Sequence, residues 1–305
     1  MPRILCTLIV ASLLTAVPAM ADVKLERKYI PDTTATTQTE TSTKQTLTLA
    51  GMDLTSNISQ FLIATSTIGK RNEDGTLPIV EKIEKLQSRL SLPGGLEISF
   101  DSGDPDKKAD NALLEPVLDL LRVIAKSKTT TLLDKENKIK GIEFADNPVE
   151  KVSDDFKSRF DPAKRKKNAE QELGMLPDNA VKSGDTWTHT SESDLGGGQI
   201  LTLETRYEYV GTEDKGSKTL DKITSKATSV TYSMNPESKS PLKVKSSELA
   251  IAASEGTILF DRTKGAIVEA VNKLKITGDL KTEIMGKEFP AKLDLAIETK
   301  STVQP

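Results

Sequence analysis

Residues 289–299, FPAKLDLAIET, decide the fold of this chain, because apolar and polar side chains alternate along them. Side chains of a β-strand point alternately to its two faces, so this segment has one apolar face and one face that contacts water. Lys292, Asp294 and Glu298 lie on the polar face. The apolar face is formed by Phe289, Ala291, Leu293, Leu295 and Ile297.

The carboxy-terminal part, residues 185–300, is predicted to be a meander of long antiparallel strands. Residues 266–285 keep apolar side chains at even positions, and Gly286-Lys287 forms the turn into residues 289–299. Strands this long must curl, since a long flat edge would aggregate. The earlier strands of the meander are expected within residues 201–209, 220–232 and 249–260, with a bulge at Gly256.

The amino-terminal half also carries strand patterns. Residues 33–49 consist almost entirely of Thr, Ser, Gln and Lys, which predicts either a linker or an edge strand with two polar faces. We favour the strand, because threonine is β-branched. Asp74-Gly75 predicts a hairpin turn. The other strands are expected at residues 23–29, 54–68, 77–92, 96–100, 129–133 and 139–144.

Two helical regions are predicted, one within the amino-terminal half and one after it. The clearest helix spans residues 116–126, where Val117, Leu118, Leu121 and Ile124 share one face. Residues 149–173 are highly charged and predict two short helices. Asp161-Pro162 is a typical helix start, and Gly174 is expected to end the second helix.

These elements predict an α+β fold that is mostly β: a strongly curved antiparallel sheet, or half-barrel, with a few helices on its concave side. The alternative is an ordinary pair of packed sheets. We expect a signal peptide at residues 1–21 and a single β-rich domain at residues 22–305. Its two halves, 22–147 and 175–305, would be joined by the charged helical segment 148–174.

The first residues have the pattern of an export signal. Arg3 precedes a short apolar run at residues 4–17, and Ala19-Met20-Ala21 is a small-x-small cleavage site. Cleavage near Ala21 would leave 284 of the 305 residues, located in the periplasm or outside the cell. Cys6 lies inside this signal, so the exported chain would use neither disulfides nor cysteine chemistry, and no lipid anchor is expected.

Composition excludes several classes of function. Without Arg3 the chain has 41 basic and 45 acidic side chains, a mildly acidic and mixed balance that argues against nucleic-acid binding. Aromatic residues make up only 4% of the chain, which argues against a carbohydrate-stacking surface. No transmembrane segment is expected in the mature chain.

The candidate chemical motifs have simpler structural explanations. Asp101, Asp104, Asp106 and Asp110 lack the spacing of a calcium loop and suit helix capping. The sole histidine, His189, has no nucleophile elbow to serve and is predicted to be structural. We therefore expect no catalytic residue, no metal and no cofactor.

Two further motifs are also weak. Ser240-Pro241-Leu242-Lys243 matches Ser-x-x-Lys, but the motif lies in a loop instead of at a helix start. The three glycines at 196–198 lack the strand-and-helix setting of a phosphate loop. The basic run at 164–167 is predicted to be a solvated helix face.

The chain resembles an uncharacterised family of exported bacterial proteins, a domain of unknown function of a planctomycete type. The resemblance is carried by Val181-x-x-Gly184-Asp185-Thr186-Trp187 and by Gly256-x-x-x-Phe260-Asp261-x-x-x-Gly265. It implies no catalytic residues. The expected architecture is also remotely similar to periplasmic lipoprotein carriers of the LolA and LppX type.

Two functions follow as hypotheses. The first is a non-enzymatic periplasmic or cell-envelope protein that binds a lipid, a lipoprotein or another apolar ligand between the sheet and the helix at residues 116–126. The second is a structural or interaction module with a fully packed core, whose edge at residues 33–48 recruits another envelope protein by strand addition. A hydrolase is a third and weaker alternative. The predicted cavity lining is Leu118, Leu121, Ile276, Leu293 and Leu295.

Overall fold

The computed structural model describes residues 22–196, 198–235 and 242–304. The predicted export signal and Ser240-Pro241 lie outside these residues. The first half contains β1 (Thr33–Leu49), β2 (Met52–Ile68), β3 (Leu77–Leu92), β4 (Leu96–Asp101), α1 (Glu115–Lys126), β5 (Lys128–Leu133) and β6 (Ile139–Phe144). The remainder contains α2 (Asp154–Lys157), α3 (Pro162–Leu173), β7 (Thr186–Gly196), β8 (Gln199–Lys215), β9 (Lys218–Met234), β10 (Leu242–Asp261), β11 (Ala266–Ile284) and β12 (Lys287–Gln304).

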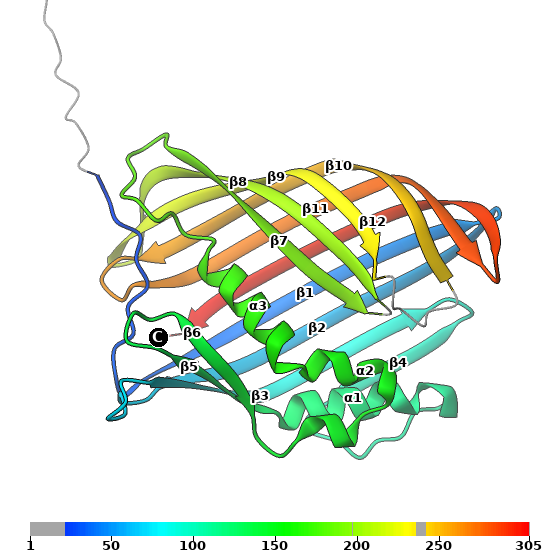
Figure 1. The fold of residues 1–305 in the computed structure, drawn as a ribbon, viewed down its shortest axis with the longest axis horizontal. Coiled ribbons are helices and arrows are strands. Elements are labelled where there is room, and N and C mark those ends of the chain that lie inside the picture. Colours follow the sequence, from blue (N-terminus) through cyan, green and yellow to red (C-terminus); the bar gives the residue numbers. More distant parts are fainter. Residues whose placement is uncertain (1–21, 197, 236–241, 305) are drawn as a thin grey trace, which may run out of the picture.

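All the strands belong to one antiparallel sheet. Its order is β6-β5-β3-β2-β1-β12-β11-β10-β9-β8-β7, and β4 pairs with β3 outside this path. The sheet curves so that β7 and β8 return in front of β1 and β2, and it remains open (Figure 1). The predicted curved antiparallel sheet is therefore confirmed, and the alternative of two separate sheets is wrong.

The two faces of the sheet differ in chemistry. The register places Leu47, Leu293 and Ile276 on the concave face, together with the other core residues. The convex face carries mostly threonines and charged residues, including the pair Thr46 and Thr55, whose hydroxyls lie 3.0 Å apart. The alternation seen in residues 289–299 thus extends across the sheet.

The strand at residues 33–49 forms, but its predicted position at an edge is wrong. β1 pairs with β2 on one side and with β12 on the other over almost its entire length. Most of its threonines, from Thr36 to Thr48, are partly buried and lie on both faces of the sheet, while Leu47 and Leu49 pair with Leu293 and Ala291 of β12. The backbone of β1 is consequently not available for strand addition.

Two other local predictions are wrong. Residues 23–29 form an extended segment with one isolated bridge, Val23 to Val181, instead of a strand. Gly256 is regularly paired, and the register shifts of β10 lie elsewhere, for example between Ile251 and Ala253. A Cβ at Gly256 would lie 2.0 Å from the Ser225 hydroxyl oxygen, so close approach of β9 explains this glycine.

Helix α1 packs its apolar face directly on the concave side of β3 and β4. Leu118 and Leu121 are buried against Leu86, Ile98 and Phe100. Pro at the start of the helix costs no hydrogen bond, as the sequence predicted.

Helix α3 lies between the two edge strands of the sheet, β6 and β7 (Figure 1). Asp161 caps its amino terminus by accepting hydrogen bonds from the amides of Ala163 and Lys164. Leu173 packs against the cluster that includes β5 and β6, and the Gln171 carboxamide accepts a hydrogen bond from the amide of Glu192 on β7. One helix therefore contacts both open edges.

Candidate functional site

The five predicted cavity residues do not share one space. Leu118 and Leu121 belong to the cluster beneath α1, whereas Ile276, Leu293 and Leu295 belong to a second cluster on β11 and β12. All five are buried. The space between the sheet and α1 is occupied by Leu118 and Leu121 packed against β3 and β4, so the features that could hold a ligand lie elsewhere.

A continuous row of uncharged polar or small residues crosses the concave face. Each member pairs directly with the next on the neighbouring strand, from β3 to β9. We call it the polar row. It consists of Ser88, Gln60, Thr41, Thr299, Asn272, Gly256 and Ser225.

A depression of about 730 Å³ is centred on the polar row. It spans β11, β12 and β1 to β4, and Thr41, Gln60 and Thr299 each stand in the middle of the three residues that their strand contributes. Small side chains create this hollow, because Ser and Thr fill less space than the leucines on either side. Gln60 and Asn272 are exposed within the row, so their amide groups are accessible to a ligand.

A large apolar surface adjoins the polar row. Along β11, Leu274, Ile276 and Leu280 follow Asn272 on the same face and are buried in one cluster with Leu293. Several members of this cluster are only half-buried, although they are large and apolar. They include Leu47, Leu203, Val230, Tyr232, Leu249 and Ile251.

The sheet divides between β9 and β10 at this apolar surface. Within the described residues, backbone pairing of these strands is limited to residues 221–225 and 256–260. Beyond that point side chains bridge the strands: Ser254 Oγ accepts from the Ala227 amide at 2.8 Å, and Ser247 Oγ donates to the Tyr232 carbonyl at 2.9 Å. A groove of about 1020 Å³ lies along this seam, lined in part by Val230, Leu249 and Ile251.

The side chains of the polar row carry no charge, but charged residues flank the row along the strands. The lining of the depression includes Glu40, Arg89, Asp101, Lys273, Glu298 and Lys300.

Glu81 lies on the concave face of β3, about 23 Å along the strand from Ser88 at ~3.3 Å per residue. It remains accessible to solvent, yet desolvation by the surrounding protein raises the pKa of its carboxyl group, the charge of Arg165 lowers it, and Glu172 raises it.

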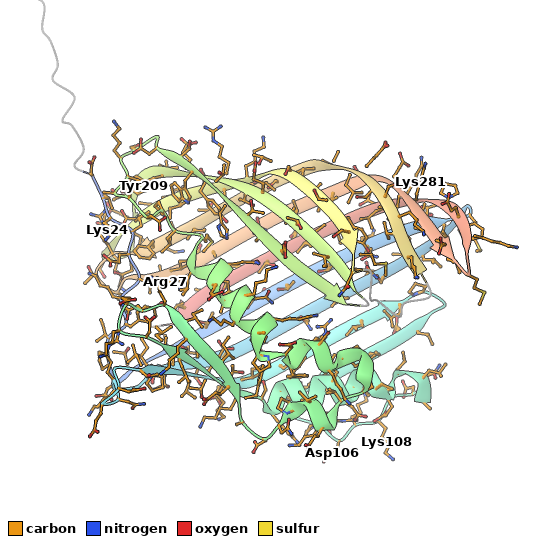
Figure 2. All side chains as sticks on the ribbon, in the orientation of Figure 1. Lys24, Arg27, Asp106, Lys108, Tyr209 and Lys281 are labelled. Atoms are coloured by element: carbon orange, nitrogen blue, oxygen red, sulfur yellow. The ribbon has the colours of Figure 1, made fainter. Side chains whose placement is uncertain are left out.

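A buried cluster that the sequence analysis missed lies at the other end of the sheet. Asp221, only 2% exposed, accepts hydrogen bonds from the Tyr209 hydroxyl at 2.8 Å and from Arg262 Nε at 2.9 Å. Figure 2 shows Tyr209 at the same end as Lys24 and Arg27, opposite Lys281. The sequence did carry one signal for this cluster. Asp221 lies two residues before Ile223, so this charged residue shares the core-facing side of its strand.

The four tyrosines allow a test of this burial. Burial and the Asp221 carboxylate raise the pKa of Tyr209 to about 12, and burial raises that of Tyr232 to about 12. The neutral phenols are favoured in the folded state. Their contribution to stability is therefore complete below pH ~10 and is lost as pH rises toward ~12.

We expect an ultraviolet titration of the folded protein to show Tyr209 and Tyr232 ionising near pH 12, and a titration in denaturant to show them ionising near pH 10. Complete ionisation of the folded protein by pH 10 would contradict this.

The distinctive sequence motifs are structural. Asp185 accepts a hydrogen bond from the Lys182 amide, and the Trp187 indole donates to the Met175 carbonyl at 2.9 Å while stacking on Tyr207. Asp261 caps the β10–β11 turn through the amides of Thr263 and Lys264. The polar groups of Asp185, Trp187 and Asp261 are therefore hydrogen-bonded within the protein and serve its structure.

The candidate chemical residues are dispersed. Asp101 accepts from Gln87 on the convex side of the sheet and from the Gly103 amide. His189 lies on the concave face of β7 beside Gly174, and its Nε2 atom is buried without a hydrogen-bond partner. Among the described residues, no group of three or more His, Cys, Asp or Glu could hold a metal ion.

Fold and concave face together define a class: a curved, open antiparallel sheet with helices packed on its concave side. The chain belongs to a family of unknown function (DUF6263), whose pattern matches residues 82–285. This agrees with the resemblance to an uncharacterised family seen in the sequence. No curated protein matches the chain.

Several solved structures are similar at low scores. Lipovitellin, in a structure concerned with lipid–protein interactions, has a TM-score of 0.44 and 8% identity over 91% of this chain and 26% of lipovitellin. This chain thus spans about a quarter of the length of that protein. An outer membrane channel from Pseudomonas putida F1 has a TM-score of 0.25 and 10% identity, covering 92% of this chain and 98% of the channel. A DUF1329 family protein from Desulfovibrio piger has a TM-score of 0.13 and 8% identity, covering 85% of this chain and 83% of that protein. Scores this low carry no functional argument.

The described part of the chain contains no helix with the length and apolarity needed to cross a bilayer.

Proposed function

We propose that the protein is an exported, non-enzymatic protein of the periplasm or cell exterior that binds a lipid or another apolar ligand against the concave face of its sheet. The observation that carries this proposal is the set of half-buried apolar side chains beside the β9–β10 seam. Val230, Leu249 and Ile251 line its groove of about 1020 Å³ and join the cluster of Ile276 and Leu293. The groove is also lined by Arg206, Lys226, Glu255 and Lys273, and the aliphatic parts of such long side chains can pack against an apolar ligand.

The ligand position differs from the one expected between the sheet and α1. Helix α1 packs tightly, so the proposed site lies instead along the groove at the β9–β10 seam. Half-buried leucines in contact with water are unfavourable by roughly 25 cal/mol per Å² of apolar surface, and a bound acyl chain would remove this cost. The strand-addition mode of the alternative hypothesis is wrong, because β1 is paired on both sides.

The test is binding of a neutral apolar dye, Nile red, to the purified protein, with mass spectrometry of co-purifying lipids. We expect saturable dye fluorescence, and at least a tenfold weaker affinity in Leu249→Asp, because a carboxylate in an apolar site is costly. Ser246→Asp is the matched control, since Ser246 lies on the same strand, is exposed and pairs with Lys281 on the convex side. A protein that carries no lipid and does not bind the dye would refute the proposal.

A further inference from the structure

The polar row interrupts the apolar surface on β2, β3 and β11, whereas on β1 and β12 it adjoins further polar residues, Thr39, Thr43 and Ser301. On β11, Asn272 lies directly between Ala270 and Leu274 on the concave face, and on β3 Ser88 lies between Leu86 and Leu90. Packing alone would favour apolar side chains at these positions. Seven adjacent strands instead place hydrogen-bonding or small residues at the same level.

The row offers hydrogen bonds without charge. Asn272 and Gln60 each present an amide that both donates and accepts, and Thr41 and Thr299 present hydroxyls. None of the row's own side chains is charged, so an ionised headgroup would find no opposite charge within the row, and a desolvated unpaired charge is strongly unfavourable. This chemistry suits hydroxyl and ester groups better than a carboxylate, phosphate or ammonium group.

The apolar part of the seam groove begins beside the row and continues in one direction. From Gly256 to Leu249, seven residues along β10 span about 23 Å at ~3.3 Å per residue. Leu249 and Ile251 are half-buried and line this groove together with Val230 of β9. The arrangement of a short polar site and a long groove with apolar residues matches a ligand with a compact head and an extended chain.

Building on the proposed function, we infer that the ligand is an amphiphile with an uncharged, hydroxyl- or ester-bearing headgroup, such as an acylglycerol. Its headgroup lies on the polar row and hydrogen-bonds to Asn272, Thr299 and Gln60. Its acyl chain runs along the groove at the β9–β10 seam, past Ile251, Leu249 and Val230. Serine hydroxyls bridge this seam instead of a backbone ladder.

The experiment is displacement of Nile red from the purified protein by monooleoylglycerol and by oleate at pH 8, two ligands with the same chain and different heads. We expect monooleoylglycerol to displace the dye at a concentration at least tenfold lower than oleate. The variant Asn272→Leu combined with Thr299→Val should weaken displacement by monooleoylglycerol about tenfold, because each lost hydrogen bond reduces affinity severalfold. Dye affinity itself should not fall.

Thr302→Val is the matched control, because Thr302 lies three residues along β12 on the convex face and its substitution should change nothing. Gln60→Leu, at an exposed position of the row, provides a second variant if the double variant fails to fold. Equal displacement by oleate, or undiminished displacement in the row variants, would overturn the inference while leaving apolar binding intact. Absence of dye binding by the unmodified protein would instead overturn the proposed function.

Discussion

Replacing Asp221 by Ala is expected to lower the free energy of unfolding by about 1–3 kcal/mol, because it leaves the buried Tyr209 hydroxyl without its acceptor, whereas Arg262 is 46% exposed and can be solvated. Asp221 is 2% exposed and is bound by both Arg262 and the Tyr209 hydroxyl. Without the carboxylate, the guanidinium and the buried phenol lose their partner at the end of the sheet where β8, β9 and β10 meet. Urea denaturation followed by circular dichroism measures the change.

The matched control is Asp294→Ala. Asp294 pairs with Lys275 at 3.3 Å on the convex face, where its side chain is 52% exposed. Such exposed pairs contribute little, so the change should stay within about 0.5 kcal/mol. Adding Arg262→Met to Asp221→Ala should change stability little further, since the Arg262 guanidinium is 46% exposed and is solvated without its partner. An Asp221→Ala protein as stable as the control would show that the carboxylate of Asp221 does not hold this end of the sheet.

Replacing Leu118 by Ala is expected to destabilise the protein by about 2–5 kcal/mol without changing its affinity for Nile red. Leu118 is 2% exposed and packs against the cluster of Leu86, Ile98 and Phe100 beneath α1. The lost side chain leaves a cavity in a packed core, whereas the proposed ligand lies on the far side of the polar row. Parallel urea denaturation and dye titration separate the two effects.

The control for this substitution is Leu113→Ala, in the short helical turn preceding α1. Leu113 is 79% exposed, so its loss should change stability by less than about 0.5 kcal/mol. The alternative position of the ligand, between the sheet and α1, makes the opposite prediction. If Leu118→Ala left stability unchanged and altered dye affinity, Leu118 would line the binding site and the proposed position would be wrong.

Much of the fold was predictable because its signals are local. The alternation in residues 289–299 required only the period of a β-strand, and β12 forms with Leu293 and Leu295 inward. Asp161-Pro162 likewise specifies its own helix start, since capping depends on the amides of the next few residues. The family resemblance rested on short turn and core motifs, and these proved to be structural.

The candidate site was less predictable, because its residues are brought together by pairing between distant strands. Ser88 and Asn272 are 184 residues apart in the chain, and nothing in either local sequence places them in one row. The same is true of the central position of β1 and of the separation of Leu118 from Ile276 into different clusters.

By itself, the sequence determined which residues form strands and helices and which face of each is apolar, since these depend on the spacing of neighbouring side chains. The tertiary structure decided which strands are neighbours, where the sheet divides between β9 and β10, and that α3 lies between its two edges. These outcomes depend on the register and curvature of the sheet as a whole. Register is a relation between segments that are remote in the chain, so it arises only when the strands pair.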